Sequence, residues 1–201
     1  MDPTPSLKSL HLARIERTKK RLFEGPGVPF QCPKILLDSI HTTLTLYSTP
    51  GEAIGSIIWS GSGALIEYLA EHSSELTIGK RILEVGCGVG VAGLCCASGL
   101  KAAEVVLTDV ASLCDLPQHN VNVNALAHKG SARVCPLDWG EESAWEEFLT
   151  SNPQFAAGGL DTIVGSDVVY TQQGAKALGL ECSADGAKGD HTIYRIKRKT
   201  P

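Results

Sequence analysis

The stretch from Ile82 to Gly93 reads Ile-Leu-Glu-Val-Gly-Cys-Gly-Val-Gly-Val-Ala-Gly and decides the fold of this chain. An apolar run of strand type leads into a glycine-rich turn, and a helical stretch follows. Gly86, Gly88 and Gly90 let the backbone turn with positive φ and let a ligand approach the main chain. The first turn of the helix offers unpaired N–H groups. This pattern predicts a strand, a tight loop and a helix that together bind a nucleotide-type cofactor.

A second apolar run places an acidic residue at the spacing that such a site needs. Val105-Val106-Leu107 ends in Thr108-Asp109, about nineteen residues beyond Gly90. A carboxylate at the tip of a neighbouring parallel strand can accept the hydroxyl protons of a ribose. Asp109 is therefore a candidate ribose ligand.

These residues alone leave the cofactor open. The segment from Gly88 to Gly93 also satisfies G-x-G-x-x-G, the dinucleotide pattern, so an NAD-dependent oxidoreductase is one alternative. Glu84 inside the strand and the shortness of the remaining chain, too small for a separate substrate domain, argue against NAD. A glycine turn that only joins a strand to a helix is the other alternative.

Composition limits the class of protein. With 201 residues, 43% hydrophobic and 20% charged, the chain is expected to form one soluble globular domain. A net charge of −4 argues against a nucleic-acid partner. The sequence shows neither a signal peptide nor an apolar run approaching the ~20 residues of a membrane span, so we expect no membrane association and a cytoplasmic or nuclear location. Seven scattered cysteines and six histidines without ligand spacing predict neither a disulfide framework nor a metal site.

The chain divides into a peripheral segment, residues 1–30 with a helix candidate over 10–22, and a domain over 31–201. Within that domain we expect a hairpin and lid (31–79), a cofactor-binding core (80–170) and a shortened C-terminal part (171–201). Alternating residues over 43–47, a turn over 49–52 and a second run over 54–59 predict the hairpin, followed by a helix over 64–71.

From Lys80 onward β-branched runs alternate with helical stretches. This alternation is typical of right-handed βαβ crossovers and predicts an α/β fold, a doubly wound and mostly parallel sheet of Rossmann-like type. The predicted strands are 81–85, 104–108, 132–137 and 161–169, and the predicted helices are 91–98, 116–127 and 141–149.

Six motifs in this order resemble those of the seven-stranded S-adenosylmethionine-dependent methyltransferases, in the methyltransferase-like group that modifies lysines of non-histone proteins. The resemblance covers roughly residues 40–171. Its motifs are Gly55-x-x-x-Trp59, Glu84-x-Gly86-x-Gly88-x-Gly90, Thr108-Asp109, Asn120-x-Asn122-x-Asn124, Leu137-Asp138-Trp139 and Asp167-Val168-Val169-Tyr170.

The resemblance implies S-adenosylmethionine as the cofactor and a protein substrate that bears a target lysine. It assigns cofactor contacts to Trp59, Glu84, Gly86, Cys87, Gly88, Gly90, Asp109, Trp139 and Ser166. Trp139 offers a flat apolar face for adenine, and the less favoured alternative is a core tryptophan beneath the sheet edge. Trp59 would close over the cofactor, or anchor the lid by hydrophobic burial alone.

Asp167 and Tyr170 are the candidate catalytic residues. Methyl transfer to a lysine amine is an in-line displacement, so the protein mainly aligns the two reactants in a dry channel. Asp167 would hold the incoming ammonium and Tyr170 would orient the amine. The alternatives are a strand-end cap for Asp167 and a core aromatic for Tyr170.

The C-terminal part departs from the family pattern. Only 31 residues follow Tyr170, too few for the remaining crossovers, although residues 178–182 and 191–199 resemble the end of a helix and the closing strand of the family. An internal deletion near residues 171–177 would account for this and would expose the edge of the fourth strand, with which the closing strand could pair. A cofactor-binding but inactive interaction module is then the alternative function.

Overall fold

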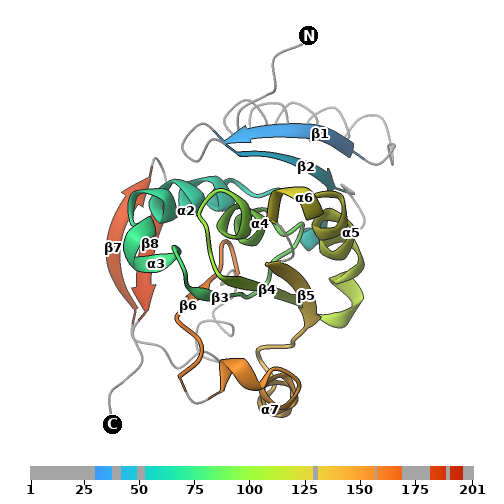
Figure 1. The fold of residues 1–201 in the computed structure, drawn as a ribbon, viewed down its shortest axis with the longest axis vertical. Helices are drawn as coiled ribbons and strands as arrows, with labels where there is room; N and C mark the ends of the chain where they lie inside the picture. The colour runs from blue at the N-terminus through green and yellow to red at the C-terminus, as the bar shows by residue number, and fades with distance from the viewer. Residues whose placement is uncertain are drawn as a thin grey trace.

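The computed structural model describes residues 30–37, 42–48, 53–128, 131–156, 158–168, 182–188 and 191–196. A four-stranded parallel sheet in the order β5-β4-β3-β6 forms the centre (Figure 1). Its strands are β3 (Arg81–Glu84), β4 (Glu104–Asp109), β5 (Ala132–Pro136) and β6 (Thr162–Val164). The predicted α/β fold with a parallel sheet is confirmed.

Three of these strands end within one residue of their predicted bounds, but β6 is much shorter than the predicted strand over 161–169. The chain leaves strand geometry at Gly165, and Asp167 adopts a φ of 57° in the left-handed region. A residue in that conformation cannot continue a strand. Ser166 and Asp167 therefore lie in a bend beyond β6.

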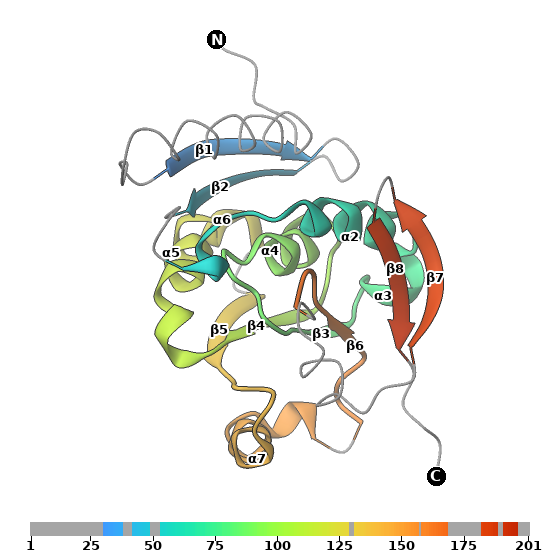
Figure 2. The same cartoon turned by 180° about the vertical axis from the view of Figure 1, so that it is seen from behind.

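Helices cover both faces of the sheet (Figures 1 and 2). One face carries α2 (Ser60–Glu71), α4 (Val91–Ser98), α5 (Asp115–Val123) and α6 (Ala125–His128), with α3 (Ser73–Leu76) and η2 (Ala111–Leu113) at its ends. The other face carries α7 (Glu142–Ser151) and η3 (Pro153–Phe155). The helix predicted over 116–127 is thus two helices that meet at Asn124, and α2 begins four residues before its predicted start.

Alternation along the strands divides the core into two clusters. Ile82, Val105 and Leu107 face α4, whereas Leu83 and Val106 face α7, and all five are fully buried. Successive side chains point to opposite faces of the sheet, and helices cover both faces. Nearly every residue of these strands is therefore apolar.

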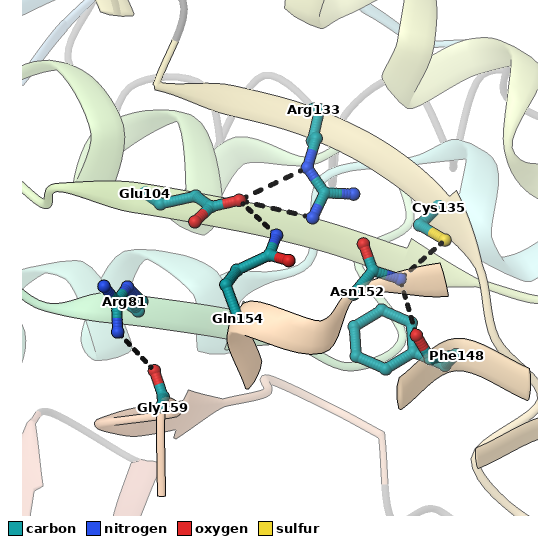
Figure 3. A network of polar contacts seen from close by, with 8 residues as sticks. All are labelled: Arg81, Glu104, Arg133, Cys135, Phe148, Asn152, Gln154 and Gly159. Carbon is teal, nitrogen blue, oxygen red and sulfur yellow. Dashed lines mark hydrogen bonds and ion pairs between the residues drawn. The ribbon is translucent and has the colours of Figure 1, made fainter. Parts of the chain in front are cut away.

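Polar contacts hold the α7 layer against the strands (Figure 3). The Glu104 carboxylate on β4 accepts hydrogen bonds from Arg133 on β5, at 3.2 and 3.4 Å, and from Gln154 of η3 at 3.0 Å. Asn152 donates to the Phe148 carbonyl at 2.7 Å and closes the end of α7. The Arg81 guanidinium donates to the Gly159 carbonyl and holds the chain that enters β6.

The N-terminal hairpin differs from the prediction. β1 (Phe30–Leu37) pairs antiparallel with β2 (Thr42–Ser48), whereas residues 54–56 form the short helix η1 (Ile54–Ser56) and pair with no strand. The prediction that residues 54–59 form the second strand was therefore wrong, because Gly55 packs onto the glycine loop instead. The predicted helix over 10–22 and the turn over 49–52 lie outside the described residues.

The C-terminal strands form a separate hairpin. β7 (Cys182–Lys188) pairs antiparallel with β8 (His191–Ile196), and the pair lies beside α2 (Figures 1 and 2). The pairing of the closing strand with the fourth strand is thus not observed, and β6 is the outermost strand of the described central sheet. None of the helices in the described ranges is long and apolar enough to cross a membrane.

Candidate cofactor site

The glycine loop joins β3 to α4 at the carboxyl edge of the sheet. Gly86, Gly88 and Gly90 have φ values of 58°, 54° and 81°, the left-handed conformation that the sequence predicted. A Cβ on Gly88 would lie 2.7 Å from the Gly55 carbonyl oxygen of η1. Close approach of these two backbones therefore requires glycine at this position, and it brings the lid segment onto the loop.

Asp109 lies at the tip of β4 and points to this loop. Its Oδ2 accepts a hydrogen bond from the Gly88 N–H at 2.9 Å, and its Oδ1 accepts one from the Val110 N–H at 2.9 Å. The Asp109 carbonyl also accepts the Leu137 N–H at 2.8 Å, which ties the start of the Trp139 loop to the same point. These contacts hold the carboxylate beside the glycine loop, at the position where the sequence predicts a ribose ligand.

Glu84 is turned away from this edge. Its Oε2 accepts the Gly93 N–H of α4 at 3.0 Å in the sheet–helix interface, where the residue is 3% exposed. Burial raises the pKa of this carboxyl to about 8, and the nearby Asp109 charge adds to the rise. Glu84 is therefore mostly protonated at neutral pH. Its hydrogen bond with Gly93 ties β3 to α4, the two elements that the glycine loop joins.

Cys87 lies within the loop between two of its glycines. Its N–H donates to the Thr108 carbonyl at 2.9 Å, and its thiol is buried. Burial, with the charges of Glu84 and Asp109, raises the thiol pKa well above its usual value. The thiol therefore stays neutral and is not a reactive group of this loop.

The bend after β6 meets the start of α2. Trp59 is the residue before the first turn of α2, and the Ser62 hydroxyl hydrogen-bonds the Ser166 hydroxyl at 2.9 Å. The Asp167 carboxylate lies directly against Gly61, in space that a side chain at residue 61 would fill. Ser166 and Asp167, two of the predicted residues, thus lie against the first turn of α2, which Trp59 precedes.

Of the two predicted residues not yet placed, the structure describes only Trp139. Trp139 follows β5 and is half-buried against the cluster that faces α7. Tyr170 lies outside the described residues. The structure brings together the other predicted site residues at the carboxyl ends of β3, β4 and β6, except that the Glu84 side chain points into the interior.

Sequence reasoning missed three contacts. Gly55 was noted only as part of a motif, and the packing of Gly61 on Asp167 carried no sequence signal. Asn120 and Asn124 resembled the family helix, but their role was not predicted. Their separation of four residues, which places two polar side chains on one helix face, is a signal that was present.

Comparison with known proteins agrees with this geometry. The sequence model of a family described as "Lysine methyltransferase" matches residues 39–196. The chain is 28% identical to mouse "EEF1A lysine methyltransferase 3" over 59% of this chain and 45% of that protein. It is 32% identical to zebrafish "Protein N-lysine methyltransferase METTL21A" over 62% of this chain and 52% of that protein. The chain thus spans about half the length of these curated relatives.

Another relative and one solved structure are also similar to this chain. The Arabidopsis thaliana "Calmodulin-lysine N-methyltransferase" is 30% identical over 58% of this chain and 36% of that protein. A solved structure from Streptococcus mutans, provisionally described as a SAM-dependent methyltransferase, covers 74% of this chain and 42% of its own at 12% identity, with a TM-score of 0.43, which is too remote to carry an argument. From the family match over residues 39–196, this chain belongs to the lysine methyltransferase family, whose cofactor is S-adenosylmethionine.

Proposed function

We propose that this chain transfers a methyl group from S-adenosylmethionine to lysine side chains of a non-histone protein, with residues 31–201 as its methyltransferase domain. The observation that carries the proposal is the meeting of the glycine loop, the Asp109 carboxylate and the Ser166–Asp167 bend at one edge of the sheet. The relatives named for EEF1A and calmodulin suggest a protein substrate, and a cytoplasmic or nuclear location suits one.

The residues fit this cofactor. The loop has few side chains, so the cofactor would approach its main chain at Gly86, Cys87, Gly88 and Gly90. Asp109 would bind the ribose hydroxyls. Ser166, Trp59 and Trp139 would complete the site, the last beneath the adenine. When bound, S-adenosylmethionine supplies a methyl group on a positively charged sulfur.

The protein's own contribution to transfer is alignment and control of charge. A lysine amine attacks only in its neutral form, so it must lose a proton on the way to the reacting position. Asp167, an exposed carboxylate at the end of β6, would hold the incoming ammonium while the proton passes to solvent, and Tyr170 would orient the amine. We propose that Glu84 acts through the loop it supports rather than through contact with the cofactor.

Calorimetric titration of the purified chain with S-adenosylmethionine tests the cofactor site. Replacing Asp109 with alanine removes a buried carboxylate that accepts the Gly88 N–H of the loop, so we expect an affinity loss of at least about ten-fold. Asp115→Ala is the matched control, because Asp115 is an exposed carboxylate six residues further along. Equal binding by both variants would contradict the assignment of Asp109.

A second candidate function is a module that binds the cofactor without catalysis. The pairing of β7 with β8, rather than with β6, favours this alternative, because none of the described strands covers the outer edge of β6. Radiolabelled methyl transfer to cell-lysate proteins, with Asp167→Ala as the control, separates the two functions. A chain that binds S-adenosylmethionine but labels no protein would be the module, and binding of NAD in its place would restore the oxidoreductase alternative.

A further inference from the structure

Two asparagines, Asn120 on α5 and Asn124 at the junction of α5 and α6, bind the N-terminal hairpin in the way that a third strand would. Asn120 and Asn124 lie one helical turn apart, 0% and 5% exposed, whereas Asn122 between them is exposed. Buried amides are found where they can satisfy several hydrogen bonds at once, because an unpaired polar group in the interior is costly.

Both side chains pair with the free edge of β2. The Tyr47 N–H donates to Asn120 Oδ1 at 2.8 Å, and Asn120 Nδ2 donates to the Tyr47 carbonyl at 3.0 Å. Asn124 repeats this pair on Thr45, at 2.9 and 2.7 Å. Each amide thus makes the two backbone hydrogen bonds that a residue of a neighbouring strand would make, and the hairpin is fixed to α5.

The second N–H of each amide distinguishes the two residues. Asn120 Nδ2 also donates to the Val89 carbonyl at 2.8 Å, and Val89 lies between Gly88 and Gly90 of the cofactor loop. Asn124 Nδ2 instead donates to the Asn120 carbonyl of α5 at 2.7 Å. One nitrogen of Asn120 therefore joins the hairpin and the cofactor loop, while Asn124 joins the hairpin to α5 alone.

We propose that Asn120 is a positioning residue that couples docking of the N-terminal hairpin to the shape of the cofactor loop, so that docking and S-adenosylmethionine binding favour each other. The inference rests on the cofactor site proposed above. Movement of β2 would draw the Asn120 amide away from Val89 or leave that buried carbonyl unpaired. Because coupling between two sites is reciprocal, an ordered loop must stabilise the docked hairpin by the same factor.

The experiment compares Asn120→Ala with Asn124→Ala. Each variant loses two hydrogen bonds to β2 and keeps the edge contact between Tyr47 and His119, at 4.5 Å between ring centroids, so we expect similar losses of stability. Only Asn120→Ala also removes the hydrogen bond to the buried Val89 carbonyl. We expect it to weaken S-adenosylmethionine binding roughly five- to ten-fold, the value of one hydrogen bond, and Asn124→Ala to change affinity less than two-fold.

Hydrogen exchange on the wild-type protein gives a second readout that needs no variant. Saturating S-adenosylmethionine should slow exchange of the Thr45 and Tyr47 amides by about the same five- to ten-fold. Equal affinity losses in the two variants, or unchanged exchange in β2, would overturn the coupling. Failure of the wild-type chain to bind S-adenosylmethionine would instead overturn the proposed cofactor site.

Discussion

At the scale of single residues, Glu84 makes the stability of the fold depend on pH. Its pKa is raised to about 8 from an ordinary value of 4.5, because burial disfavours the charged form. The protonated carboxyl is the form that the fold prefers. The stabilisation from this protonated carboxyl is complete below pH 4.5 and is lost as the pH rises towards 8. Near neutral pH the loss lowers the free energy of unfolding by on the order of 3 kcal/mol.

Glu84→Gln should remove this pH dependence, because the amide oxygen can still accept the Gly93 N–H but does not titrate. We expect the free energy of unfolding of the variant to change little between pH 5 and 8, and to exceed that of the wild type by about 4 kcal/mol at pH 8. Urea unfolding at each pH measures this difference. Glu147→Gln on the exposed face of α7 is the control, and identical pH profiles for wild type and Glu84→Gln would refute the prediction.

Much of the candidate site could be predicted from the sequence, because glycine spacing and strand-end acids follow from local geometry. The direction of the Glu84 side chain was predictable in principle. Glu84 lies two residues from Ile82, so strand alternation places both on the α4 face. The contacts of Gly61 with Asp167 and of Gly55 with Gly88 were not predictable, since each joins segments distant in the sequence.

At the scale of elements, the sequence predicted β3, β4, β5, α4 and α7 to within two residues at each end. Buried parallel strands bounded by glycine or charge give clear signals. The sequence pattern of residues 54–59 is as typical of a strand as that of β3 or β4. In the structure, residues 54–56 pack on the glycine loop and form η1 instead. Local pattern could not reveal this, because the deciding contact is tertiary.

The α7 layer provides a test of how much one helix stabilises the sheet. Phe148 is 3% exposed and packs between Trp145 and Phe155, with ring centroids 5.5 and 6.0 Å away. Phe148→Ala should lower the free energy of unfolding by about 3–5 kcal/mol, through lost burial and the cavity left behind. Leu126→Ala is the control, since Leu126 is 95% exposed on α6 and should change stability by less than about 0.5 kcal/mol. Similar losses in the two variants would show that α7 is not packed as described.

At the scale of the whole molecule, the sheet is covered unevenly. α7 and η3 lie over the middle of their face, where Leu83 is fully buried, but Ile163 directly opposite it on β6 is 57% exposed. Among the described strands, none pairs with the outer edge of β6. An apolar face beside an open strand edge favours association with another chain.

We therefore expect the purified chain to self-associate through β6, and Ile163→Thr to weaken that association. Threonine keeps the β-branched shape that suits a strand but removes most of the apolar surface, so the dissociation constant should rise about ten-fold or more. Sedimentation velocity over a range of concentrations measures the change. Leu126→Thr, an exposed apolar residue away from the sheet, should behave as the wild type. If Ile163→Thr and Leu126→Thr shift the association equally, or if the wild type stays monomeric throughout, the outer edge of β6 is not an association surface.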